Sequence, residues 1–417
     1  MDYNLFKSQL SQLVSYDSVQ SEEKADAPFG EQVKLCLDSF LCFASEFGFE
    51  VINYDGYAGE VVFGEGEDFG ILCHLDIVPV GKSEDWLTPP FILTEKDGKL
   101  IGRGVLDDKG PALMILHALK ELKEEGFKPN RKIRLILGCN EESGWGCIEH
   151  LKKLNLMPSA GFSPDADFPV IYAEKGILHA EFCFDCSNLK ISGGKAMNMV
   201  CDSVRATVPI DQALAQKYGL ILDSENIISS GKTAHASTPH KGVNAIEKIL
   251  PYLEEVGCVS PQIRQKLFLN STGIKSLNDQ TGFLTLSPDL IISRDNKLYI
   301  LCDVRYPATL DFEFVCKQLE SIGDYEIKGH QKSLFVDKNG PLVSTLLGVF
   351  EQVTGKTSSP IAIGGGTYAR SMKNCVAFGP VFDEDSAVCH EPNEYLKIDD
   401  LMLGFKIYKQ AIKKICK

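Results

Sequence analysis

The sequence predicts an α/β protein in which a mainly parallel sheet is flanked by helices and interrupted by an inserted α+β domain. Strand-like and helix-like patterns alternate over the first part of the chain. After residues 175–176 the pattern changes to strands with occasional helices, and the alternating pattern returns near the C-terminus. Alternation of this kind is typical of a parallel sheet with helices on both faces. We therefore expect one domain built from residues 1–177 and 338–417, with an inserted domain at 178–337.

The elements of the first domain follow from hydrophobic periodicity. The N-terminus is an amphipathic helix, and residues 69–75 (FGILCHL) and 131–140 (RKIRLILGCN) are apolar runs of strand length. Residues 111–126 repeat leucines at helical spacing and end at a glycine, as helices commonly do. Residues 144–155 predict a further helix.

The inserted domain and the C-terminal part are assigned in the same way. We expect strands at 177–185, 203–211, 282–293 and 297–307, and helices at 242–257 and 309–323. The C-terminal part predicts a helix at 341–355, a short strand at 375–380 and a last amphipathic helix over 401–415.

Composition excludes several classes of protein. The net charge is −14 and no basic stripe occurs, which argues against nucleic-acid binding. No apolar run reaches the roughly 18 residues needed to span a bilayer, and the N-terminus does not have the pattern of a secretory signal. Many of the 14 cysteines lie within apolar strand-like runs, which is typical of reduced, buried thiols. We expect a cytoplasmic protein that binds neither membrane nor nucleic acid.

Polar side chains interrupt the predicted sheet just after its strands. These residues are His74 and Asp76, Asp107 and Asp108 before the first long helix, Glu141 and Glu142, and Asp165. Individually, each group has an ordinary explanation: a core histidine, a helix cap, a solvated helix start and a turn. Together they indicate a ligand site, because such sites gather beyond the carboxyl ends of parallel strands.

A bound cation explains why so many carboxylates converge, since they would otherwise repel one another. Histidine with carboxylates, and no clustered thiolates, favours zinc or a similar divalent ion. His74 is then a ligand. Asp76, two residues on, is placed to accept the other ring N–H and fix the tautomer.

Seven segments in order give the sequence a family resemblance: HLDIVPVG, GRGVLDDKG, NEESGWG, SPDADFPVIYAEKG, GKTAHASTPHKGVNA, GGGTYAR and CHEPNEY. Together they resemble the zinc peptidase and aminoacylase family that also contains succinyl-diaminopimelate desuccinylase. Within it the chain is most similar to the dipeptidase V branch of Xaa-His or β-Ala-Xaa dipeptidases. The resemblance extends over nearly the whole chain.

The resemblance implies a zinc-peptidase-like catalytic domain with two zinc ions per chain, or manganese or cobalt in their place. Asp107 matches the bridging ligand, and a cis peptide bond after it is common in the family. His74 and Asp165 would complete one site, and Glu142 and His390 the other. A surface-loop histidine is the ordinary alternative for His390.

The resemblance also assigns catalytic and substrate-binding residues. Glu141 matches the general base that takes a proton from water and returns it to the leaving amine. The inserted domain is expected to be a lid, on which His235 contacts the oxygen of the tetrahedral intermediate. Asn198 matches the same neighbourhood, although a turn residue is the alternative. The resemblance implies that Arg305 and the backbone N–H groups of Gly364, Gly365 and Gly366 bind the substrate carboxylate.

The expected function is metal-dependent hydrolysis of unblocked dipeptides. The alternatives are an N-acyl-amino-acid deacylase or a desuccinylase-type amidohydrolase, and a non-catalytic binding protein of the same fold. The last is disfavoured because every matched ligand and the base are present. A dipeptidase also needs a partner for the substrate amine, for which Asp108 and the neighbours of Asp165 are candidates. We expect a monomer rather than a dimer.

Overall fold

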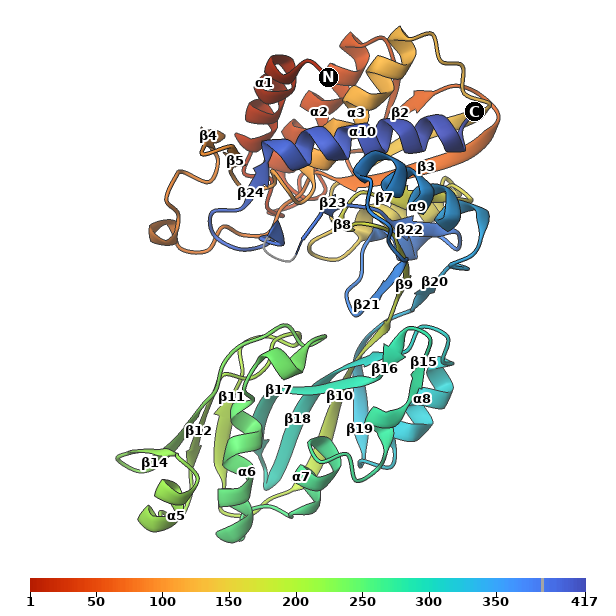
Figure 1. Ribbon diagram of the computed structural model, residues 1–417. Coiled ribbons are helices and arrows are strands. Elements are labelled where there is room, and N and C mark those ends of the chain that lie inside the picture. The colour runs from red at the N-terminus through yellow and green to blue at the C-terminus, as the bar shows by residue number, and fades with distance from the viewer. Residues whose placement is uncertain (384–385) are drawn as a thin grey trace. The chain divides into compact units, whose positions relative to one another are not determined.

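The computed structural model of the chain describes residues 1–383 and 386–417 (Figure 1). These residues form two compact units. Unit 1 consists of Met1–Tyr172, Val336–Ile361 and Thr367–Lys417, and unit 2 of Ala173–Phe335 with Ala362–Gly366. The glycine-rich segment that begins at Gly364 is therefore divided between the two units, because its glycines belong to unit 2 and the residues from Thr367 onward to unit 1.

Unit 1 is built from a central sheet and its flanking helices. Its helices are α1 (Tyr3–Val14), α2 (Glu31–Glu46), α3 (Lys109–Glu124), α4 (Gly146–Lys153), α9 (Pro341–Thr354) and α10 (Ile398–Ile415). Its strands are β1 (Glu50–Tyr54), β2 (Ala58–Phe63), β3 (Glu67–His74), β4 (Thr94–Lys96), β5 (Lys99–Ile101), β6 (Arg131–Gly138), β7 (Gly161–Ser163), β8 (Ala166–Asp167), β9 (Ile171–Glu174), β21 (Ile361–Ile363), β22 (Cys375–Ala377), β23 (Pro380–Val381) and β24 (Tyr395–Lys397), of which β9 and β21 run into unit 2.

The central sheet is parallel in its middle and antiparallel at its edges. Its strand order is β1-β2-β6-β3-β7-β22-β9-β20, with β21 beside β9. Strands β6, β3, β7 and β22 are parallel neighbours, whereas β1–β2, β2–β6 and β22–β9 pair antiparallel. The predicted α/β class is confirmed, and the antiparallel edges refine the expectation of a mainly parallel sheet.

Helices cover both faces of this sheet, as alternation along β2 shows. The backbone at Gly59 lies against Leu37 and Leu41 of α2. The next residue back, Ala58, packs on the opposite face in a cluster with Leu151 of α4. Because successive strand residues point to opposite faces, α2 and α4 lie on opposite sides. The carboxyl ends of the central strands therefore remain as the place where polar side chains gather.

Unit 2 is a separate α+β body. Its strands are β10 (Gly176–Asp185), β11 (Lys190–Gly193), β12 (Ser203–Thr207), β13 (Ile221–Asp223), β14 (Asn226–Ser230), β15 (Asn278–Asp279), β16 (Gly282–Phe283), β17 (Thr285–Arg294), β18 (Lys297–Tyr306), β19 (Tyr325–Gln331) and β20 (Leu334–Phe335). Its helices are α5 (Gln212–Lys217), α6 (Ala245–Glu255), α7 (Gln262–Leu267) and α8 (Phe312–Leu319).

The main sheet of unit 2 is antiparallel, with strand order β13-β14-β12-β11-β17-β18-β10-β19. One face packs with the helices into a hydrophobic core that includes Leu298, Ile300, Cys302 and Val304 of β18. Alternation places Asp303 and Arg305 of the same strand on the other face. A strand that looks uniformly apolar over part of its length therefore delivers two charged groups to one side.

Two expectations from composition can be compared with the structure. Among the described residues, no helix is both long enough and apolar enough to cross a membrane. All 14 cysteines are free thiols, most of them buried, as their positions in apolar runs predicted.

Candidate metal centre and substrate-binding residues

Three neighbouring parallel strands bring the first polar groups together. His74 is the last residue of β3, and Glu141 and Glu142 follow β6, which pairs with β3 from Glu67 to His74. Asp165 follows β7, the neighbour of β3 on its other side. Asp107 and Asp108 lie at the N-terminus of α3, and the peptide bond between them is cis, as the sequence resemblance implied.

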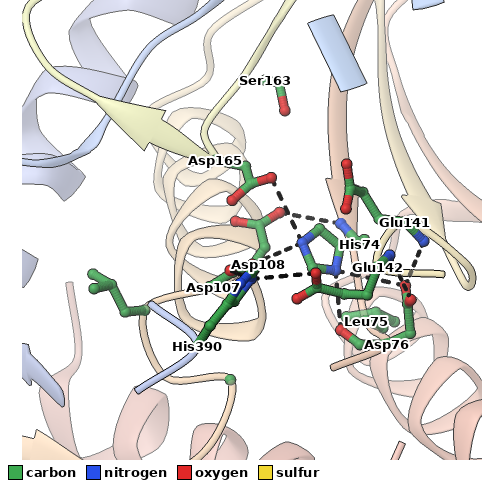
Figure 2. A network of polar contacts seen from close by, with 12 residues as sticks. His74, Leu75, Asp76, Asp107, Asp108, Glu141, Glu142, Ser163, Asp165 and His390 are labelled. Carbon is green, nitrogen blue, oxygen red and sulfur yellow. Dashed lines mark hydrogen bonds and ion pairs between the residues drawn. The ribbon is translucent and has the colours of Figure 1, made fainter. Parts of the chain in front are cut away.

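Asp107 lies between two histidines that are far apart in the sequence (Figure 2). Its Oδ1 is 2.9 Å from Nε2 of His74, and its Oδ2 is 3.0 Å from Nε2 of His390. Asp165 Oδ2 lies 3.6 Å from the same nitrogen of His74, and Glu142 Oε2 lies 3.3 Å from that of His390. Each oxygen of Asp107 thus faces one histidine, and each histidine has a second carboxylate beside it.

The tautomer of neutral His74 leaves its contact with Asp107 in need of a positive charge, which either a proton or a metal ion can supply. Nδ1 of His74 lies 3.0 Å from the backbone carbonyl oxygen of Asp76, which only accepts hydrogen bonds, so Nδ1 is the donor. In the neutral ring Nε2 then has a lone pair, directed at an acceptor oxygen of Asp107. Both atoms are buried, and neither has a hydrogen-bond partner in the described part of the chain. Burial lowers the pKa of His74, but Asp107 and Asp165 outweigh burial and raise it well above its usual range, so either a proton on Nε2 or a bound cation makes this contact favourable.

The electrostatics of the cluster point the same way. Burial disfavours ionisation of Asp107, but His390 and His74 outweigh it and hold the pKa of this carboxyl below its usual range. Burial lowers the pKa of His390, but the effect of Asp107 and Glu142 is larger and opposite, so the pKa is raised to about 11. Burial and the nearby charge of Asp107 raise the pKa of Glu142 to about 7. The carboxylates therefore attract positive charge strongly into this site.

The residues present fit a divalent metal. Ligand atoms of His74, Asp107 and Glu142 lie within 4.8 Å of one another, as metal ligands must. Imidazoles combined with carboxylates are a donor set that suits zinc and similar ions. The structure brings the five predicted ligands together, Asp165 and His390 included, although their roles as ligands remain predictions.

Asp76 has a different contact from the one expected. Its carbonyl is the nearer acceptor for Nδ1 of His74, whereas its carboxylate oxygen Oδ1 lies 3.5 Å away. The carboxylate instead accepts the backbone N–H groups of Glu141, at 2.9 Å, and Glu142, at 3.0 Å. Asp76 therefore orients His74 mainly through its backbone and holds the start of the Glu141–Glu142 segment through its side chain.

Glu141 is half-buried beside His74, and its backbone N–H donates to the carboxylate of Asp76 (Figure 2). Burial raises the pKa of its carboxyl well above the usual range, and the neighbouring charges of Asp165 and Glu142 add to the effect. A carboxyl in these surroundings takes up a proton readily, and it can serve as a general base when a nearby positive charge keeps it ionised.

Asp108 does not suit the task of binding a substrate amine. Its side chain is fully buried, and its Oδ2 accepts the backbone N–H of His74 at 3.1 Å. Of the two candidates suggested from sequence, Asp108 is therefore a structural support of the cluster, and the neighbours of Asp165 stay a prediction.

Asn198 and His235, both predicted from sequence, lie on neighbouring backbone segments of unit 2. Met199 and His235 form an isolated β-bridge, and the backbone N–H of Ala236 donates to the carbonyl of Asn198 at 2.9 Å. The backbone N–H of Ser237 donates to Nδ1 of His235 at 3.2 Å. Because Nδ1 is an acceptor there, the neutral ring carries its proton on Nε2.

Arg305 is held by protein acceptors on one side. Its Nε and Nη2 donate to the two carboxylate oxygens of Asp303 at 2.6 and 2.7 Å. Its Nη1 donates to the carbonyl oxygen of Gly364 at 2.8 Å. Three of the five guanidinium N–H groups thus bind protein, and a substrate carboxylate would have to use the other two.

Gly364, the first residue of the glycine triplet, lies against Ser237 and accepts a hydrogen bond from Arg305. A side chain at Gly364 would lie 2.7 Å from Cβ of Ser237, so only glycine fits there without displacement. Gly364 presents its carbonyl to Arg305. Arg370 follows in a 3-10 turn at Tyr368–Ser371, which belongs to unit 1.

Several supporting residues were not found from sequence. Asp303 precedes Arg305 by two positions, and strand periodicity alone would have placed both on one face. Tyr368 is fully buried with its ring edge-on to that of His74, 6.0 Å between centroids. Ser237 contacts Nδ1 of His235 through its hydroxyl and its backbone N–H. The carboxylate of Glu394 accepts backbone N–H groups, whose position the residue type of the donors does not indicate.

The sequence is also similar to those of known proteins. The sequence matches the profile of peptidase family M20/M25/M40 over residues 70–414. It is 34% identical over 452 residues to the Beta-Ala-Xaa dipeptidase of Lactobacillus delbrueckii subsp. lactis. This match covers 98% of this chain and 95% of the relative.

Two solved structures share the fold. An M20 family metallo-carboxypeptidase from Sulfolobus solfataricus is 17% identical, with a TM-score of 0.62, and the match covers 99% of both chains. The aminoacylhistidine dipeptidase from Vibrio alginolyticus is 15% identical, with a TM-score of 0.61, and covers 98% of this chain and 97% of its own. At these identities the likeness concerns the fold.

Proposed function

The chain belongs to peptidase family M20/M25/M40, and from this membership and the geometry of its carboxylate–histidine cluster we propose that it is a metal-dependent dipeptidase that hydrolyses unblocked dipeptides. The family and the relative named Beta-Ala-Xaa dipeptidase support the reaction class.

The observation that supports the proposal most is the position of Asp107. Its two oxygens face two histidine nitrogens, at 2.9 and 3.0 Å, and each histidine has its own second carboxylate. We propose that Asp107 bridges two zinc ions, or two manganese or cobalt ions. His74 and Asp165 would hold one ion and Glu142 and His390 the other. When bound, such ions polarise the scissile carbonyl and lower the pKa of water toward 7.

Glu141 is proposed as the general base. Burial favours the protonated form of its carboxyl, so once nearby cations have ionised it, it is disposed to take a proton from the attacking water. The same carboxyl then returns the proton to the amine of the leaving amino acid. Asp76 supports this role, because its carboxylate fixes the backbone N–H of Glu141 at 2.9 Å.

Unit 2 is proposed to recognise substrate. His235, with its proton on Nε2, has a donor for the oxygen that becomes negative during the reaction. The side-chain amide of Asn198 would add a second donor. Arg305 is proposed to bind the terminal carboxylate through the two N–H groups that neither Asp303 nor Gly364 uses. The N–H groups of Gly365 and Gly366 would assist it.

We also propose that the enzyme works in the cytoplasm as a monomer. Fourteen free thiols are typical of a reducing compartment. The monomer follows from the resemblance to the dipeptidase V branch alone. Light scattering of the purified protein at working concentration tests it, and a mass of about twice 46.0 kDa would contradict it.

A substrate panel tests the proposed reaction. The purified chain is treated with EDTA and then supplied with zinc, manganese or cobalt. Free dipeptides, their N-acetyl forms and N-succinyl amino acids are compared as substrates. We expect hydrolysis of free dipeptides that EDTA abolishes and a metal restores. Faster hydrolysis of the acylated compounds would favour an amidohydrolase of the same family, and no hydrolysis with any metal would favour a binding protein.

A further inference from the structure

We propose that Glu394 is a positioning residue of the metal centre, because its carboxylate fixes the loop that carries Asp107 to the segment that carries His390. The inference rests on the proposed function, in which both of those residues are metal ligands. It assigns a task to a side chain that does not itself face the cluster of ligand atoms.

The carboxylate of Glu394 contacts the residues that immediately precede Asp107 in the chain, and Asp107 itself. Its Oε1 accepts the backbone N–H groups of Leu106 at 2.8 Å and Asp107 at 3.2 Å. Its Oε2 accepts the backbone N–H of Gly104 at 3.0 Å and Nη1 of Arg103 at 2.8 Å. The side chain is fully buried. One carboxylate therefore fixes four donors in the five residues that end at the proposed bridging ligand.

The backbone around Glu394 is fixed to the same part of unit 1. The N–H of Gly102 donates to the carbonyl of Glu394 at 3.0 Å, and β24 then pairs antiparallel with β5. The side chain of Asn393 accepts the N–H of Leu87 at 2.6 Å and donates to the carbonyl of Asp85 at 3.0 Å. The contacts of Asn393 join residues 306 and 308 positions apart in the chain.

His390 depends on this anchor more than the other ligands do. It lies four residues before Glu394 in a loop, and 55% of its side chain is exposed, whereas His74 ends a central strand and is buried. Its backbone φ is +66°, an uncommon conformation for a histidine. Arg103 reaches its carbonyl as well, at 3.5 Å. A shift at position 394 would therefore move both Asp107 and His390, from opposite sides of their 3.0 Å contact.

A purely structural role is the alternative, since any buried glutamate with several partners stabilises a fold. Glu60 provides a matched control. It is buried in β2 of the same unit, and its carboxylate accepts Nε of Arg134 at 2.7 Å, Nη2 of Arg134 at 2.6 Å and the hydroxyl of Tyr54 at 2.7 Å. It makes no contact with the five proposed ligands in the described part of the chain. Losing it should lower stability without altering metal affinity.

The experiment compares Glu394→Gln, Glu394→Asp and Glu60→Gln in the full chain. Zinc affinity is measured by competition with a chromogenic chelator, and the unfolding midpoint of the metal-free protein by circular dichroism. Substituting residues that orient metal ligands typically costs 10- to 100-fold in affinity. We expect a loss in that range for Glu394→Gln, because an amide presents N–H groups to N–H donors. Glu394→Asp should also weaken zinc binding, because its shorter side chain cannot reach all four donors.

The outcomes separate the two roles. Weaker zinc binding in a folded Glu394 variant, with unchanged affinity in Glu60→Gln, supports the inference, and Glu394→Asp decides it where the glutamine variant does not fold. Wild-type affinity in a folded Glu394 variant, or an equal loss in Glu60→Gln, overturns it. Zinc binding that Asp107→Asn leaves intact would instead contradict the proposed function, and this inference with it.

Discussion

At the scale of single residues, the ligand set was foreseen and its supports were not. His74, Asp107 and Asp165 were found because each follows a recognisable strand or precedes a recognisable helix. Asp76 was expected to accept the other ring N–H of His74, and it does so mainly through its carbonyl, since sequence spacing does not distinguish a side-chain acceptor from the carbonyl of the same residue. The same limit concealed Glu394, whose partners are mostly backbone N–H groups.

Glu141→Gln is expected to lose hydrolysis while keeping its metal. The amide cannot take a proton from water, and loss of a general base typically costs about 10²- to 10⁴-fold in rate. Glu141 is not among the proposed ligands, so zinc content should equal that of the wild type. Turnover of a dipeptide and metal analysis of the same sample measure the two effects.

Glu149→Gln is the control for this substitution. Glu149 lies on α4, exposed, in an ion pair with Lys152 at 2.9 Å. Its replacement should leave both turnover and zinc content unchanged. Wild-type turnover in Glu141→Gln would remove Glu141 from the mechanism.

At the scale of elements, the order of helices and strands followed from periodicity, whereas their irregularities did not. The helices α3, α4, α6, α8, α9 and α10 fall where leucine, isoleucine and phenylalanine repeat at helical spacing. A β-bulge in β17 between Pro288 and Leu290 has no such pattern. It places Asp289 in the interior, where Oδ1 accepts the hydroxyl of Ser287 at 2.6 Å and Oδ2 has no partner among the described residues.

The bulge predicts a pH dependence of stability. Burial raises the pKa of Asp289 to about 8, above the value of about 3.9 in an unfolded chain. The folded state therefore binds the proton of Asp289 more tightly than the unfolded chain does. The stability gained from this protonation is complete below about pH 4 and is lost as pH rises through about 8. Asp289→Asn resembles the protonated acid. We expect its unfolding midpoint to decline less between pH 5 and pH 8 than that of the wild type.

Thermal unfolding followed by circular dichroism measures this difference. Asp295→Asn, an exposed change in the turn between β17 and β18, should have the wild-type pH dependence. An Asp289→Asn protein whose midpoint falls with pH as steeply as the wild type would show that Asp289 is ionised in the folded state throughout this range.

At the scale of the whole molecule, distant parts of the chain supply one cluster. His390 comes from the C-terminal part of unit 1, after the insertion of unit 2, and meets Asp107 at 3.0 Å. The return of the alternating pattern after the insertion made this meeting foreseeable. The assignment of residues 362–366 to unit 2 was not, because five residues with three glycines have no periodicity that links them to either unit.

Metal binding should stabilise the protein. Without a cation, the carboxylates of Asp107, Asp165 and Glu142 are held close to one another by only two histidines, so an ion that relieves their repulsion binds the folded state selectively. Zinc at about 100 times its dissociation constant contributes about 2.7 kcal/mol. We expect the unfolding midpoint to fall by several degrees in EDTA and to recover with zinc. An equal recovery in His390→Ala would contradict the role of His390.

The most direct test of the account is the position of metal ions in crystals grown with zinc and measured at the zinc absorption edge. The account predicts two anomalous peaks, one in contact with His74, Asp107 and Asp165 and the other with Asp107, Glu142 and His390. A zinc-saturated crystal with no peak beside Asp107, or with His390 away from it, would contradict the account.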